Sequence, residues 1–203
     1  MSSRRVLFTL AFLTAFFVLP GLVFGHPGHH HHAHEPGFLA GLLHPITGLD
    51  HLLAALAIGA WGALLGGQQR WQLPLAFVGA LLVGAVAALL GLAIPAVHLF
   101  SALSVVLLGA AIALSLKWPQ VAAIGAVSLF GLFHGGAHFE ALTAFSAHTA
   151  LYTGALVFST GILHLGGALL SQRFLVEKSH AAPRYAGASV AIFGVILVGF
   201  QLF

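Results

Sequence analysis

Six apolar segments follow one another from Phe38 to the C-terminus, each close to the roughly 20 residues that a helix needs to cross a bilayer. Only 5% of the 203 residues are charged and the mean hydropathy is +1.04, whereas about 25% of a soluble domain is charged. The sequence therefore predicts an all-α integral membrane protein. Its six transmembrane helices, which form one domain over residues 38–203, are expected at 38–66, 72–90, 98–116, 120–142, 150–171 and 185–203.

The basic residues after the first segment are few and lie singly in the short connections. If the mature N-terminus is outside the membrane, all of them fall on the cytoplasmic side, in agreement with the positive-inside rule: Arg70, Lys117, Arg173, Lys178 and Arg184. Both chain ends are then expected outside. Because these residues form no patch, the pI near 10.0 does not indicate a nucleic-acid partner.

Residues 1–25 resemble a secretory signal peptide. Two arginines precede an apolar run from Val6 to Leu19, and small or medium residues lead up to Gly25, as a signal peptidase requires. We expect cleavage after Gly25, which makes His26 the new N-terminus. The alternative is an uncleaved first transmembrane helix, since the apolar run is long for a signal peptide.

The next segment, residues 26–37, is expected to be a flexible tail, because it is rich in histidine and poor in large apolar side chains. Histidine-rich tracts of this kind bind transition metals. The alternative is a purification tag, but Pro, Gly and Ala interrupt this tract. Besides His26, the histidines expected to collect metal are His29, His30, His31, His32 and His34.

The first apolar segment contains ionisable side chains at His44, Asp50 and His51. Such groups are costly in hydrocarbon and normally face a protein interior or a watery path. On a helix, His44, Thr47 and His51 share one face, and Asp50 lies beside it. Pro45 lacks an amide hydrogen and Gly48 lacks a side chain, so we expect a broken helix that lines a cavity.

A second group of candidate ligands lies in the fourth segment. His134 and His138 are four residues apart, which is the spacing that lets two imidazoles of one helix bind one metal ion. Glu140 points about 200° away from His138 on an ideal helix. It is expected either to contact another partner or to be turned inward by unwinding at Gly135 and Gly136.

The remaining histidines of the apolar segments are more ambiguous. His164 shares a face with Thr160 in the fifth segment, where it can be a ligand or a hydrogen-bonded packing residue. His98 and His148 lie near segment ends and are expected to be ordinary. The candidate metal ligands are therefore His44, Asp50, His51, His134 and His138, with His26, Glu140 and His164 as further candidates.

The chain has no cysteine, so a metal site must use nitrogen and oxygen donors. Neutral imidazoles with a carboxylate suit nickel, cobalt, zinc or copper(II), and the general affinity order does not choose among them.

Two segments resemble the signatures of a known family. The HupE/UreJ nickel and cobalt permeases carry His-Pro-x-x-Gly-x-Asp-His, which residues 44–51 match at every fixed position. Their second signature, Phe-His-Gly-x-Ala-His-Gly, is similar to residues 133–138, although Phe139 replaces the final glycine. The resemblance implies a transporter rather than an enzyme, one that takes up Ni²⁺ or Co²⁺ across the bacterial inner membrane with both termini in the periplasm.

Other functions are compatible with the same residues. Histidines on two helices can ligate haem iron, and a zinc-dependent hydrolase can use Glu140 or Asp50 to activate water, although the HExxH pattern is absent. A metal sensor without transport is a third alternative.

Overall fold

The computed structural model describes residues 37–140, 145–176 and 181–203. The predicted signal peptide and nearly all of the histidine-rich tail lie outside the described residues. All regular secondary structure within them is helical, which confirms the all-α part of the predicted fold class. The helices are α2 (Phe38–Thr47), α3 (Leu49–Leu65), α4 (Gln69–Leu89), α5 (Val97–Ala113), α6 (Gln120–Phe139), α7 (Ala147–Leu170) and α8 (Ala182–Leu202), and a π-helical segment, η2 (Ser171–Val176), continues α7.

Each of the six predicted apolar segments contains helix, and the first contains the pair α2 and α3. Four helical segments are long and apolar enough to cross a membrane: α4, α6, α7 with the start of η2, and α8. The pair α2 and α3 passes as a fifth, although it bends by 77° at its junction. The chain is therefore a multi-pass membrane protein. Because α5 has only 17 residues, the count of six spans stays a prediction.

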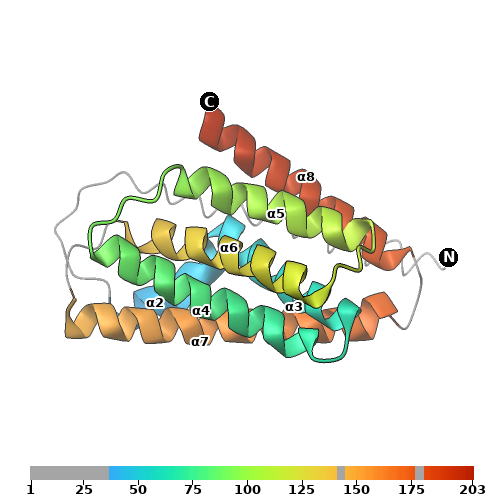
Figure 1. Cartoon of the computed structure of the whole chain (residues 1–203), viewed down its shortest axis with the longest axis horizontal. Helices are drawn as coiled ribbons and strands as arrows, with labels where there is room; N and C mark the ends of the chain where they lie inside the picture. Colours follow the sequence, from blue (N-terminus) through green and yellow to red (C-terminus); the bar gives the residue numbers. More distant parts are fainter. Residues whose placement is uncertain (1–36, 141–144, 177–180) are drawn as a thin grey trace. The chain divides into compact units, whose positions relative to one another are not determined.

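The helices pack closely in pairs. Helix α4 lies along α6 and α5 lies along α8, while α2 and α3 both pack on α7 (Figure 1). A Cβ atom on Gly135 of α6 would overlap the carbonyl oxygen of Leu81 on α4. Likewise, a Cβ atom on Gly59 of α3 would overlap the carbonyl oxygen of His164 on α7. Glycine thus lets these backbones touch, as helix association in lipid requires.

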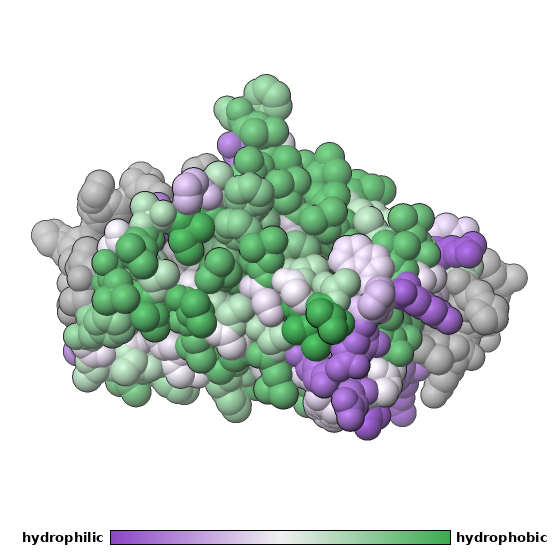
Figure 2. All heavy atoms as spheres, in the orientation of Figure 1, coloured by the Kyte–Doolittle hydropathy of each residue, from purple (hydrophilic) through white to green (hydrophobic). Residues whose placement is uncertain are grey.

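The visible surface is mostly hydrophobic, and hydrophilic residues gather mainly at one end, over the connection between α3 and α4 (Figure 2). Gln68 in this connection and Arg70 in the first turn of α4 are exposed. Gln120 at the start of α6 donates a hydrogen bond of 2.7 Å to the side-chain oxygen of Gln72 on α4. The α5–α6 connection with Lys117 therefore lies at the same end as Arg70.

Candidate metal centre

The first ligand segment is a broken helix, as predicted. Helix α2 ends at Thr47. The next residue, Gly48, has an extended backbone (φ −80°, ψ 106°), and its amide donates to the His44 carbonyl at 2.9 Å. Helix α3 then begins in a new direction. The Thr47 hydroxyl bonds to the carbonyls of Leu43 and His44 at 3.2 Å. The Thr47 hydroxyl is therefore bonded within its own helix. Thr47 also does not share a helix face with His44 and His51, as it would on an ideal helix, because the helix is interrupted at Gly48.

Three imidazoles from the two predicted ligand clusters form a continuous chain. His138 of α6 lies between His44 and His51, which flank the break. Its Nδ1 is 2.7 Å from His44 Nε2, and its Nε2 is in hydrogen-bond contact with His51 Nδ1. His51 Nε2 is in turn 2.9 Å from the Thr160 hydroxyl on α7. The two ligand segments, almost 90 residues apart in sequence, therefore meet in one place.

His134 completes a compact group. One ligand atom each from His51, His134 and His138 lie within 4.8 Å of one another, and the first two side chains are fully buried. Nitrogen ligands lie about 2.0–2.1 Å from an ion such as zinc, so small side-chain movements would close these three atoms around one ion. His134 Nδ1 is buried without a hydrogen-bond partner among the described residues, which leaves this nitrogen available to bind an ion.

Two hydroxyl groups fix which ring nitrogens carry hydrogen. The Thr160 hydroxyl donates to the Leu156 carbonyl at 2.7 Å, so it accepts from Nε2–H of His51. The Ser104 hydroxyl on α5 donates to the Ser101 carbonyl at 2.6 Å, so it accepts from Nε2–H of His134 at 3.1 Å. Both histidines therefore present the lone pair of Nδ1, which is the form that binds a metal ion.

The tautomer of His51 also determines how His138 and His44 bond to each other. With a lone pair on His51 Nδ1, His138 donates from Nε2 and accepts from His44 at Nδ1. An ion bound at His138 Nε2 would require the opposite tautomer, which turns the hydrogen bond to His44 around. Whether His44 donates or accepts in this hydrogen bond therefore depends on whether His138 binds an ion.

The predicted carboxylates do not enter the three-histidine group. Asp50 is half-buried in the first turn of α3 and interacts electrostatically with His44 and His134. Glu140 instead pairs with His98, whose Nε2 lies 3.2 Å from its Oε2, and both side chains are more than half exposed. Of the two expectations for Glu140, contact with another partner is therefore the one observed.

Sequence reasoning missed three residues around the centre. Ser104 belongs to no recognised motif. Its one sequence signal is that it follows Ser101 by three residues, which places two polar side chains on one face of an apolar helix. The spacing of Thr160 places it beside His164 and gives no sign of its contact with His51. Phe77 of α4 is fully buried, and its ring contacts those of His51 and His134 at centroid distances of 6.0 and 5.4 Å.

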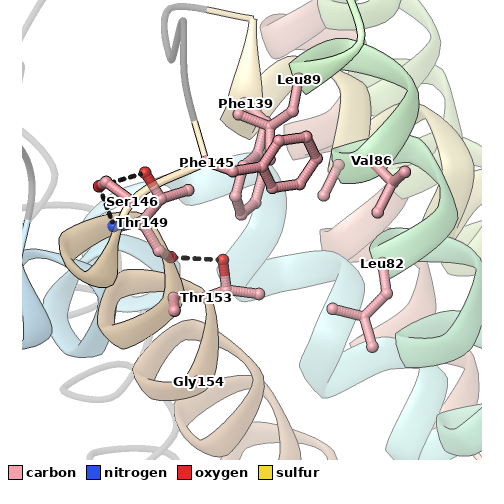
Figure 3. Close-up of a pocket in the computed structure, with 11 residues that line it drawn as sticks. Leu82, Val86, Leu89, Phe139, Phe145, Ser146, Thr149, Thr153 and Gly154 are labelled. Carbon is pink, nitrogen blue, oxygen red and sulfur yellow. Dashed lines mark hydrogen bonds between the residues drawn. The ribbon is translucent and has the colours of Figure 1, made fainter.

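A cavity of about 300 Å³ lies elsewhere, between α4 and the start of α7 (Figure 3). Leu82, Val86 and Phe145 form its apolar walls, and hydroxyl groups of Thr149 and Thr153 lie at one side. None of the candidate metal ligands lines it. This cavity is therefore separate from the histidine group.

Comparison with known proteins agrees with this arrangement. A family model described as HupE / UreJ protein matches residues 14–197. The chain is 39% identical over 199 residues to Protein HupE of Rhizobium leguminosarum bv. viciae, and the aligned region covers 98% of this chain and 99% of that protein. No solved structure matches the chain. Because the family model extends over nearly the whole sequence, the chain is a member of the HupE/UreJ family.

Proposed function

We propose that this protein is a permease that imports a divalent transition-metal ion, nickel or cobalt, across the bacterial inner membrane. The observation that carries the proposal is the buried group of His51, His134 and His138, whose ligand atoms lie within 4.8 Å of one another. His44 and Asp50 adjoin this group and complete the proposed intramembrane site. In this proposal the chain crosses the membrane six times, with both termini in the periplasm and Arg70 and Lys117 in the cytoplasm.

Nitrogen and oxygen donors fit transport because conduction needs binding that is favourable enough for entry and weak enough for exit. Family membership supports the same function. A haem protein fits the geometry less well, since the rings of His44 and His138, and of His138 and His51, have centroids only 4.5 Å apart. A hydrolase that uses Glu140 also fits less well, because this carboxylate pairs with His98 at an exposed position.

Uptake of radioactive nickel or cobalt into membrane vesicles tests the proposal. Wild-type protein is expected to raise uptake above that of empty vesicles. His51→Ala is expected to lower the rate by about 100-fold or more, since even partners of metal ligands contribute about 10–100-fold. His148→Ala is the matched control, because this histidine is exposed at the start of α7. Wild-type uptake no faster than that of empty vesicles would refute the proposed function.

The N-terminal tail is proposed to collect ions at the periplasmic entrance. Deletion of residues 26–34 is expected to slow uptake when metal is scarce and to change little when metal is abundant, because tethered ligands raise the local ion concentration. The measurement is the uptake rate over a range of metal concentrations, with a Gly/Ser tail of equal length as the control. Loss of uptake at every concentration would instead make His26 an obligatory ligand of the transport site.

A further inference from the structure

His164 is a buried histidine without a hydrogen-bond partner. It lies on α7 with 3% of its surface exposed, and neither ring nitrogen has a partner among the described residues. Ser171, seven residues later, is fully buried, and its hydroxyl has no partner in the same part of the chain. Unpaired polar groups in a protein interior lower stability, and each one therefore calls for an explanation.

His164 adjoins the three-histidine group without belonging to it. Its ring contacts the Phe77 ring edge to face, with centroids 5.5 Å apart. The same Phe77 ring contacts His51 and His134. One buried aromatic side chain therefore touches two members of the group and His164, so that a single ring separates His164 from the three-histidine group.

Helix α7 carries three polar side chains on one face. Thr160, His164 and Ser171 follow at intervals of four and seven residues, which bring side chains to the same side of a helix. Thr160 is the partner of His51, so the face begins at the metal centre. It ends at Ser171, the first residue of the π-helical segment η2, and π-helical turns are frequent at functional sites.

We propose that His164 is a second ligand for the transported ion. In this proposal His164 receives the ion from the group of His51, His134 and His138 and passes it toward Ser171. This inference rests on the proposed transport function and adds an exit step to it. One imidazole and a distant hydroxyl hold an ion less tightly than three imidazoles do. A weaker site after a stronger one favours release, and the unpaired nitrogens then have a role as donors to the ion.

The test compares nickel binding, nickel uptake and thermal stability of the full-length protein. His164→Leu removes both nitrogens but keeps an apolar side chain in the same space. We expect unchanged nickel binding in equilibrium dialysis, uptake into proteoliposomes lowered by about tenfold or more, and an unfolding temperature equal to or above that of the wild type. Ser159→Ala, buried on another side of α7, is expected to leave all three quantities unchanged.

His164→Gln keeps one donor and one acceptor and is expected to recover part of the uptake. It also serves as the test variant if the His164→Leu protein fails to fold. A wild-type uptake rate for His164→Leu would overturn the inference, and a lowered unfolding temperature of that variant would then make His164 a packing residue. Loss of nickel binding along with uptake would overturn it too, because His164 would then belong to the first site. Wild-type protein that takes up no nickel would refute the transport function itself, and this inference with it.

Discussion

Replacement of Thr160 by valine is expected to weaken metal binding by about 10–100-fold, the usual effect of removing the partner of a metal-bound histidine. Valine has nearly the same shape as threonine but offers no acceptor for His51 Nε2–H, which is 2.9 Å from the hydroxyl. His51 would then lose the contact that presents its Nδ1 lone pair to the ion. The measurement is equilibrium dialysis of the purified protein with nickel, accompanied by uptake into vesicles.

Thr160→Ser is the matched control, because serine keeps the hydroxyl that donates to the Leu156 carbonyl and accepts from His51. It is expected to bind nickel nearly as well as the wild type. If valine and serine weaken binding equally, the effect comes from packing, and the hydroxyl does not select the tautomer of His51.

Replacement of Gly135 by leucine is expected to lower the free energy of unfolding by about 3 kcal/mol or more, at the upper end of overpacking effects. A Cβ atom at this position would overlap the Leu81 carbonyl oxygen, so α4 and α6 would have to separate. His134 and His138 flank Gly135 and would move with α6. We therefore expect both the yield of folded protein and nickel binding to fall.

Gly125→Leu is the control on the same helix. A Cβ atom on Gly125 has no neighbouring atom within 4 Å, so leucine there faces open space. The thermal unfolding temperature of this variant is expected to stay at or above that of the wild type, since leucine favours helix more than glycine does. Equal destabilisation by both substitutions would mean that close α4–α6 contact is not what Gly135 provides.

The sequence was sufficient for the positions of the helices and for the break between α2 and α3. Apolar length is a local property, and the break follows from the glycine and proline that lie among polar side chains in one short stretch. The spacing of His134 and His138 is also local. Such features are visible without knowledge of which helices are neighbours.

Contacts between helices could not be derived in this way. Nothing in the sequence pairs His98 with Glu140, or Ser104 with His134, because each pair joins different helices whose relative rotation depends on packing. An ideal-helix argument also failed at Thr47, since the chain leaves helical geometry at the next residue. The role of the candidate residues as metal ligands stays a prediction.

Phe139, which replaces the glycine of the second family signature, has a packing role in this chain. It is fully buried at the end of α6, and its ring contacts that of Tyr152 on α7 with centroids 5.5 Å apart. Tyr152 also contacts His44, at 5.9 Å. The larger side chain therefore fills space between α6 and α7 close to His44.

The break at Gly48 also has an electrostatic consequence. Each α-helix carries a dipole equivalent to roughly half a positive charge at its start and half a negative charge at its end. An unbroken helix would place neither charge near His44 and His51, whereas here α2 ends and α3 starts between them. The carboxylate of Asp50 lies in the first turn of α3 and offsets the positive end of that helix. The Gly48 amide and the Thr47 hydroxyl donate to carbonyls at the end of α2, but neither group carries a net charge. The negative end of α2 therefore still adds a local potential that attracts a cation between His44 and His51.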